Sequence, residues 1–363
     1  MATTINTEFD SIYLTTHLPE EIEYETDQPS LEVSIYVNTS KVFSSTYYPY
    51  QEIVVVKDIR PIIEAAMADR QTSFATLKIV AAEPTNNAPT VTYDEDGNMH
   101  MTFDNATPEP ITVTAEDIKV IYSRYKTIED SDSFLYSNFL TSRKSALIPR
   151  SVQLKLSNYT KAYAQGSNYA LIYYSHRSAP GQINTYKADL GKMQPTSEEI
   201  VTVNLTHQSF KSLVDQAMNT NCIVHGVEYH IGVRQFNIYY TDEEPTEVFL
   251  FRNAFNVEEI YSLFGATTIK TEVDRSEAVC GHKTQFYDET VKVKHEVETA
   301  QLPYDEAKWL NQMLTSKLVK RRIEDGSYEK VLISDITSEV SDSDKELIRL
   351  KFTWKYADGN EWL

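Results

Sequence analysis

Short stretches of apolar residues, each about as long as a β-strand, recur along the first 250 residues. Some alternate apolar and polar positions and others are continuously apolar, two patterns typical of half-buried and fully buried strands. The predicted strands cover residues 31–37, 53–56, 77–81, 152–156, 169–174, 200–205, 236–240 and 248–251. The pattern therefore predicts a mainly β chain.

The clearest turn signal lies within residues 89–103, where two alternating stretches flank the sequence DEDGN at 94–98. Asp-Gly between alternating stretches favours a β-hairpin. The acidic loop also resembles the start of a calcium-binding loop, but the later ligand positions and the closing Glu are absent. We therefore interpret residues 94–98 as a turn.

Helical periodicity predicts only a few helices, at residues 59–70, 210–219 and 304–319. Pro61 falls in the first turn of the first helix, where its missing N–H is harmless. The third begins with Asp305 and Glu306 and ends near Lys317 and Lys320, the termini at which the helix dipole favours each charge. Two more strands, at 328–336 and 347–356, follow a turn at Asp325-Gly326. The C-terminal order is thus predicted as strand, helix, strand, strand.

An internal similarity organises the first two thirds of the chain. Residues 52–56, a helical segment ending at Met67, and residues 77–80 are echoed by residues 199–203, a helical segment ending at Met218, and residues 236–239. We interpret the two segments as related β-sandwich-like domains, although strand-helix-strand is common enough to recur by chance. The predicted domains are 1–125, 126–247 and 248–363, and the fold class is α+β.

Tyrosine dominates the aromatic residues, with 24 Tyr against 14 Phe and 3 Trp. Tyrosine suits strands and interfaces, because its ring can be buried while its hydroxyl stays wet. Tyr47, Tyr48 and Tyr50 cluster around Pro49, and we predict that they contact a partner protein or a glycan. The alternative for these three residues is packing against neighbouring strands.

The chain carries 34 basic and 53 acidic residues, a net charge of −19, which disfavours binding to nucleic acid or to an anionic membrane. Residues 1–40 contain eight carboxylates and no Lys or Arg. They form either a solvated face or an acidic patch that docks on a basic neighbour. The sequence shows no secretory signal and no transmembrane segment, so we expect synthesis and folding in a cytoplasm.

Motifs for catalysis are missing from the sequence. It contains no phosphate-binding glycine loop, no nucleophile elbow and no HExxH metal motif, so we predict no enzyme activity, no cofactor and no catalytic residue. The four residues Cys222, His225, Cys280 and His282 have the ligand types for zinc but not the spacing, and we expect no metal site. We also expect Cys222 and His225, and likewise His225 and His230, to lie on opposite strand faces, because their separations are odd.

A family resemblance arises in the C-terminal third. The segment FLFRNAFNVEE at 249–259, the following Gly265, and residues 302–319 ahead of two long strands resemble the C-terminal part of virion proteins from phages and prophages of Bacteroidetes. The order is also similar to the fold shared by tail tube and distal tail proteins. The resemblance implies a ring-forming or baseplate-attached tail component, without cofactor or catalytic residues.

The leading hypothesis is therefore a structural subunit of a bacteriophage tail or baseplate, assembled in the host cytoplasm with copies of itself or with other virion proteins. One alternative is a carbohydrate- or receptor-binding module at a virion tip or cell surface that binds a host glycan. Another is a glycan-acting enzyme whose site leaves no trace in the sequence, since spatially assembled triads have no local motif.

Overall fold

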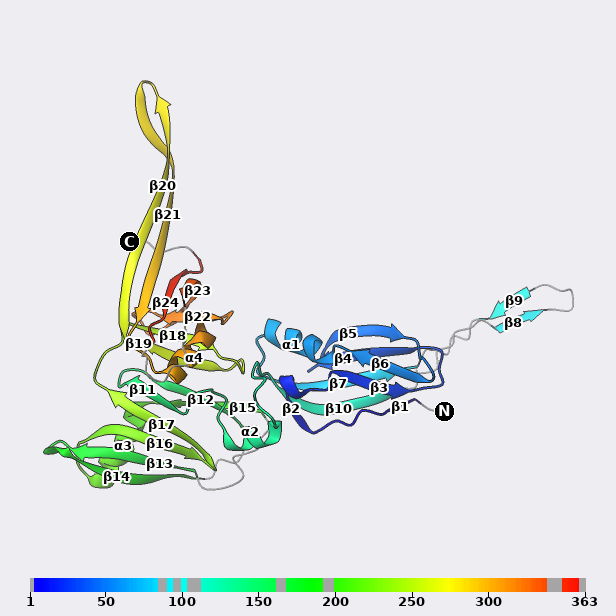
Figure 1. The fold of residues 1–363 in the computed structure, drawn as a ribbon, viewed down its shortest axis with the longest axis horizontal. Coiled ribbons are helices and arrows are strands. Elements are labelled where there is room, and N and C mark those ends of the chain that lie inside the picture. The colour runs from blue at the N-terminus through cyan, green and yellow to red at the C-terminus, as the bar shows by residue number, and fades with distance from the viewer. Residues whose placement is uncertain are drawn as a thin grey trace. The chain divides into compact units, whose positions relative to one another are not determined.

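A computed structural model describes residues 3–83, 90–93, 99–102, 112–160, 168–191, 199–337 and 348–358. The described chain is mainly β, with a few short helices between strands, which confirms the predicted fold class (Figure 1). None of its described helices is long and apolar enough to cross a membrane. The chain separates into two compact units, Met1–Asp132 and Ser133–Leu363. The second unit contains most of both later predicted domains.

The first unit is a β-sandwich-like arrangement of two sheets and one long helix. Its five-stranded sheet has the order β2 (Ile12–Leu14), β10 (Thr112–Ile121), β7 (Phe74–Ala82), β4 (Leu31–Val37) and β5 (Ser40–Tyr47). Its three-stranded sheet has the order β1 (Thr4–Ile5), β3 (Glu21–Glu25) and β6 (Ile53–Lys57). A 3-10 turn, η1 (Thr15–His17), precedes β3. Alternate residues of β3, β4, β6 and β7 form one core with Ile63 and Met67 of α1 (Ile59–Asp69).

The predicted hairpin between residues 89 and 103 is confirmed in its strands. β8 (Thr90–Tyr93) pairs antiparallel with β9 (Met99–Thr102), with Tyr93 opposite Met99. The acidic turn at 94–98 lies outside the described residues, so its resemblance to a calcium-binding loop stays untested.

The second unit begins with a similar sandwich. Its five-stranded sheet has the order β11 (Ser145–Pro149), β17 (Arg234–Thr241), β16 (Cys222–Ile231), β13 (Asn168–His176) and β14 (Ala179–Gly191). A second layer holds β12 (Leu154–Tyr159), β15 (Ile200–Leu205) and α3 (His207–Met218), and α2 (Ser131–Ser137) precedes β11. The side chain of Thr206 caps α3 by accepting a hydrogen bond from the Ser209 amide.

The two sandwiches share one topology. In each five-stranded sheet an edge strand (β2 or β11) lies parallel to its neighbour (β10 or β17), and every other pairing is antiparallel. The second-layer pairs β3–β6 and β12–β15 also match, and α1 and α3 occupy the same place in the chain order. The predicted similarity paired residues 77–80 with 236–239, and this is wrong. By sheet position β7 matches β16, because β17 matches β10.

A seven-stranded sheet completes the second unit. Its order is β19 (Glu258–Leu263), β18 (Glu247–Arg252), β22 (Val319–Arg322), β23 (Tyr328–Thr337), β24 (Lys351–Tyr356), β21 (Lys283–Thr299) and β20 (Gly265–Cys280). Val248 and Leu250 of β18 join the core of the preceding sandwich, whereas Phe249 and Phe251 join the core under α4 (Tyr304–Leu314). β18 is therefore buried on both faces, which explains why its sequence is continuously apolar.

Two predictions about this C-terminal region are corrected. The helix predicted at 304–319 ends at Leu314, and Val319 begins β22, where it lies opposite Phe251 and Val331. Val319 is β-branched, and its pairing in the sheet outweighed the helical spacing of apolar residues that predicted a longer helix. The predicted order of strand, helix, strand, strand also omitted β19, β20, β21 and β22. β20 and most of β21 are exposed and polar over most of their length, although Val291, Val293 and Val297 lie at alternate positions of β21, a strand pattern that the prediction did not use.

A β-bulge in β16 corrects a further prediction. Cys222 and His225 do lie on opposite faces, since Cys222 is in the core and His225 faces outward. His225 and His230 were expected on opposite faces as well, but the register between β13 and β16 shifts at Tyr173/Tyr174. The extra residue puts both histidines on the outer face, while Val227, Tyr229 and Ile231 point into the core.

Candidate functional site

The most exposed regular element of the second unit is the hairpin formed by β20 and β21, which we call the arm. At ~3.3 Å per residue its 16-residue strand β20 spans about 50 Å. β21 pairs with β24 only over His295–Glu298, so the rest of the described arm is a two-stranded ribbon with both edges open. Figure 1 shows the arm extending away from the remainder of its sheet.

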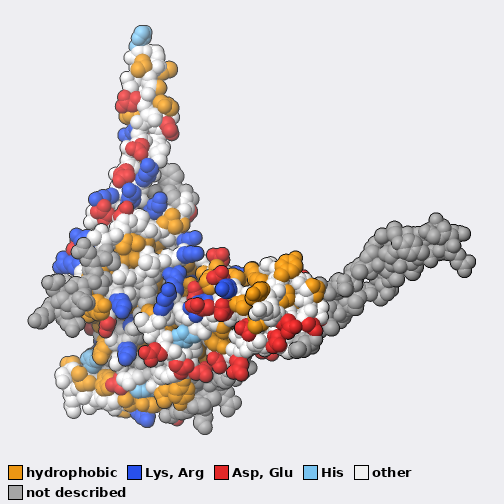
Figure 2. All heavy atoms as spheres, turned by 45° about the vertical axis from the view of Figure 1, so that its right-hand side comes forward, with side chains coloured by type: hydrophobic (Ala, Val, Ile, Leu, Met, Phe, Trp, Pro, Cys, Tyr) orange, Lys and Arg blue, Asp and Glu red, His pale blue; other side chains and the backbone are white. Residues whose placement is uncertain are grey.

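One face of the arm is polar and internally satisfied. Lys270 pairs with Glu296 at 2.6 Å, Lys292 with Asp274 at 3.3 Å and Lys294 with Glu272 at 3.5 Å. Basic and acidic side chains are interspersed along the ribbon (Figure 2). Such exposed pairs stabilise weakly, so this face is suited to solvent.

The opposite face of the arm carries exposed aliphatic side chains, with the Arg275–Glu289 ion pair beyond them toward the tip. Val273 lies directly across from Val291, and Ile269 lies on the same face nearer the base. Their exposed fractions are 44%, 48% and 55%. β-branched side chains in cross-strand pairs normally pack under a covering layer. Among the described residues, no layer covers Ile269, Val273 and Val291 on the arm.

The tip of the arm widens the apolar surface. The pairing register shifts between Ser276 and Glu277, and beyond that bulge Val279, Phe286 and Tyr287 are all exposed. The turn passes through Gly281, whose φ of +56° suits glycine. Bulges near the ends of ribbons change the direction of side chains. The tip therefore exposes aromatic and aliphatic side chains.

The base of the arm is held by close backbone contact. A Cβ on Gly265 would lie 2.3 Å from the carbonyl oxygen of Glu298, so only glycine fits there. The Ala300 amide donates to the Phe264 carbonyl at 2.6 Å. The His295 ring stacks on Trp354 with 3.7 Å between ring centroids. These contacts fix the point from which the arm leaves the sheet.

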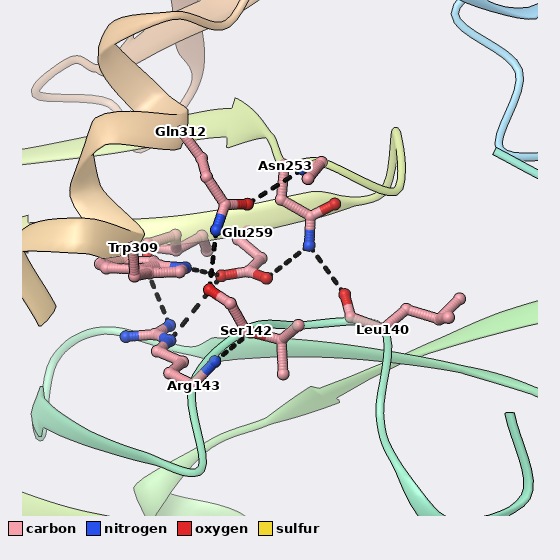
Figure 3. A network of polar contacts seen from close by, with 10 residues as sticks. Leu140, Ser142, Arg143, Asn253, Glu259, Trp309 and Gln312 are labelled. Atoms are coloured by element: carbon pink, nitrogen blue, oxygen red, sulfur yellow. Dashed lines mark hydrogen bonds and ion pairs between the residues drawn. The ribbon is translucent and has the colours of Figure 1, made fainter. Parts of the chain in front are cut away.

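A buried polar network holds the elements on either side of the arm (Figure 3). The Glu259 carboxylate on β19 accepts hydrogen bonds from Trp309 Nε1 of α4 and from Asn253 Nδ2, both at 2.5 Å. Arg143 lies 3.7 Å from Glu259 and stacks over the Trp309 ring. Gln312 of α4 donates to Ser142 at 2.7 Å. The network thus ties α4 and β19 to residues 140–143.

This network is built to stabilise structure. Glu259 is 3% exposed. Burial lowers the pKa of Arg143, and the nearby Glu259 charge only partly offsets this effect, so the pKa is lowered overall. The charged groups of this network are directed at each other, and the Glu259 carboxylate also accepts from Trp309 and Asn253. We therefore place the functional surface on the arm.

The three tyrosines predicted as contact residues differ in exposure. Tyr48 and Tyr50 are 79% and 78% exposed in the β5–β6 connection. Tyr47 ends β5 opposite Leu31 and packs against the core of the first unit. Burial raises the pKa of its hydroxyl. Two of the three predicted rings are thus available to a ligand.

The residues weighed as zinc ligands are dispersed. The Cys222 sulfur contacts His176 Nδ1 at 3.9 Å, while His225 Nε2 shares a hydrogen bond with Ser175 at 2.8 Å. Cys280 is exposed and lies with His282 at the tip of the arm. Among the described residues no group of three or more His, Cys, Asp or Glu side chains could hold a metal ion.

The chain was compared with protein-family models and with curated proteins. No family model matches it, and no curated protein matches it.

Proposed function

We propose that this chain is a non-enzymatic structural subunit of a bacteriophage virion, a tail or baseplate component that assembles with copies of itself or docks on neighbouring virion proteins. The observation that supports assembly is the arm. The assignment to a phage tail is supported by the sequence resemblance in residues 248–363.

An isolated two-stranded hairpin is at best marginally stable in water, because it lacks a layer to cover its side chains. The arm nevertheless extends far beyond its last contact with β24 and exposes Ile269, Val273 and Val291 along one face. Its open strand edges are also ready to pair with another chain. A neighbouring subunit that covers the aliphatic side chains and pairs with the open strand edges would explain both features.

The strongest test shortens the arm at a matched position. Thr271 and Val293 are directly opposite, so residues 272–292 can be replaced by Asn-Gly without changing the pairing below them. We expect the full chain to form oligomers or rings in light scattering and negative-stain microscopy. The shortened chain should stay monomeric with an unchanged unfolding transition.

A second pair of variants tests which of the two faces of the arm makes the contact. Val273→Lys with Val291→Lys should abolish assembly, because charges would enter the contact. Exchanging Glu272 and Lys294 keeps their ion pair and should leave assembly intact. The proposal fails if the full chain is monomeric at all concentrations and binds no virion protein, or if the shortened arm still assembles.

A further inference from the structure

The outer face of the five-stranded sheet in the second unit contains a slot between two tyrosine rings. Tyr173 on β13 lies opposite Gly226 on β16, and Gly226 lies opposite Tyr239 on β17. The two tyrosines therefore flank a residue without a side chain. They lie two strands apart, about twice the ~4.8 Å strand spacing, and both line the hollow above Gly226, where Tyr239 Cδ1 would lie 3.7 Å from a Cβ on the glycine.

Local geometry keeps this slot open. A Cβ on Gly226 would lie 2.8 Å from the Ile238 carbonyl oxygen, so a larger residue is excluded. The β16 bulge adjoins this glycine and turns His225 onto the same face. The hollow has a volume of about 340 Å³, and Ile183 on its rim is 63% exposed. Small-ligand sites begin at about this size.

Polar groups stand at one end of the slot. Glu228 and Asn237 are directly opposite in the β16–β17 pairing and both line the hollow. The Tyr173 hydroxyl donates a hydrogen bond to Glu228 Oε1, and His230 Nε2 lies 3.6 Å from Glu228 Oε2. The carboxylate is thus oriented as an acceptor. The Asn237 amide, whose oxygen accepts from Gln235 at 3.0 Å, places donors beside it.

The hydrogen bond to Glu228, together with burial, raises the pKa of Tyr173. The Tyr173 hydroxyl is therefore protonated at neutral pH and donates its hydrogen bond to Glu228.

The first unit provides an internal comparison, because its sheet has the same topology. There Tyr36 on β4 lies opposite Lys78 on β7, in the place that Gly226 occupies opposite Tyr173. Lys78 carries a long side chain and pairs with Glu116 at 3.4 Å. Ser34 and Ser44 hydrogen-bond to each other beside it. In the first sheet, therefore, the Lys78 side chain occupies the position that Gly226 leaves open in the second sheet.

We propose that the slot binds a pyranose ring of a neutral glycan. The C–H faces of a sugar would stack on Tyr173 and Tyr239, and two adjacent hydroxyls would donate to Glu228 and accept from Asn237. The net charge of −19 works against anionic sugars and nucleotides. Glycan binding at this sheet goes beyond the assembly role proposed for the arm.

The test uses the full chain on an array of neutral hexose-containing oligosaccharides, with saturation-transfer NMR on methyl glycosides of the responding sugars. We expect binding that falls at least about tenfold in Tyr239→Ala, a loss of about 1.4 kcal/mol. Glu228→Gln should weaken binding as well. Leu147→Ala is the matched control, since Leu147 is 50% exposed against 55% for Tyr239, lies opposite it on β11 and does not line the slot.

Each other result overturns the proposal. Absence of binding across the array does so directly. Binding that survives Tyr239→Ala but is lost in Tyr48→Ala with Tyr50→Ala would place the glycan on the β5–β6 connection instead. Binding lost equally in Leu147→Ala would indicate a general effect on the sheet. Because no variant alters the arm, these results are independent of the assembly tests.

Discussion

At the scale of single residues, burial decides the role of a carboxylate. Glu258 and Glu259 are adjacent in a chain rich in such pairs, and their sequence does not distinguish them. In the fold Glu258 reaches Lys155 at the surface, whereas Glu259 is buried against Arg143, Trp309 and Asn253. Removing one partner of a buried pair leaves the other charge unpaired in a low dielectric.

Glu259→Ala should therefore destabilise the second unit by about 3–5 kcal/mol, while Glu258→Ala should cost less than about 1 kcal/mol. Urea unfolding of both variants measures the difference. Glu259→Gln should fall between them, since an amide oxygen still accepts from Trp309. Equal midpoints for the two alanine variants would show that the network contributes little.

A second prediction at this scale concerns pH. Burial raises the pKa of Glu306 on α4, and the Arg143 charge only partly offsets this. A raised folded-state pKa means that the folded chain holds the proton more tightly than the unfolded chain. This group therefore favours folding at low pH, and its contribution is lost as pH rises through the raised pKa.

Glu306→Gln, which mimics the protonated acid, should be more stable than the natural chain at neutral pH. The advantage should shrink as pH falls through the raised pKa of Glu306, and it should be gone below the ordinary Glu pKa, where both side chains are uncharged. Urea unfolding of the pair at several pH values from acidic to neutral gives the difference directly. A difference that does not vary with pH would contradict the assigned cause.

At the scale of elements, two glycines within strands allow close contacts that a larger residue would prevent. Gly265 allows β20 to cross close to Glu298 at the base of the arm, and Gly226 forms the floor of the slot between two tyrosines. Neither lies in a turn or has a positive φ, so a single sequence gives no local reason for either glycine. Close approach of a neighbouring strand is the physical reason for both.

Gly265→Ala should destabilise the second unit by at least about 1 kcal/mol, because the native backbone cannot accept a Cβ there. Gly181→Ala is the control, since a Cβ at Gly181 meets nothing within 4 Å. That change should be neutral or slightly stabilising. Thermal unfolding compares the two, and hydrogen exchange should show faster opening of β20 only in the first variant.

At the scale of the whole molecule, the shared topology of the two sandwiches predicts how the chain can be divided. The first unit has its own core, and among the described residues the buried members of that core run from Tyr13 to Tyr122. The core of the second sandwich extends to Val248, Leu250 and Ile260, beyond the predicted boundary at residue 247. That boundary meets β18, whose two faces belong to different cores.

Fragments 1–132 and 133–363 should each unfold cooperatively, whereas fragment 133–247 should not, because it lacks the β18 and β19 residues that close its core. Circular dichroism with thermal unfolding tests all three. A cooperative transition in 133–247 would show that β18 belongs to the C-terminal sheet alone.

The sequence by itself determined the strands with strong alternation or continuous apolar runs, because burial on one or both faces imposes those patterns. It also determined the starts of α1 and α4, where Pro61 and the acidic first turn are local signals. The turn at Asp325-Gly326 was likewise readable, and Asp325 accepts from the Ser327 amide at 2.7 Å. Each of these depends on neighbours in the chain.

Only the tertiary structure decided the rest. The arm is an exposed ribbon that alternates apolar and polar residues over only part of its length, so no continuous pattern marks its extent. The end of α4 was set by the pairing of Val319 with β18 and β23. The slot depends on Tyr173, Gly226 and Tyr239, which come from three strands and meet only through their register. Contacts between distant segments leave no local pattern, and this is why the two proposed binding surfaces emerged from the fold.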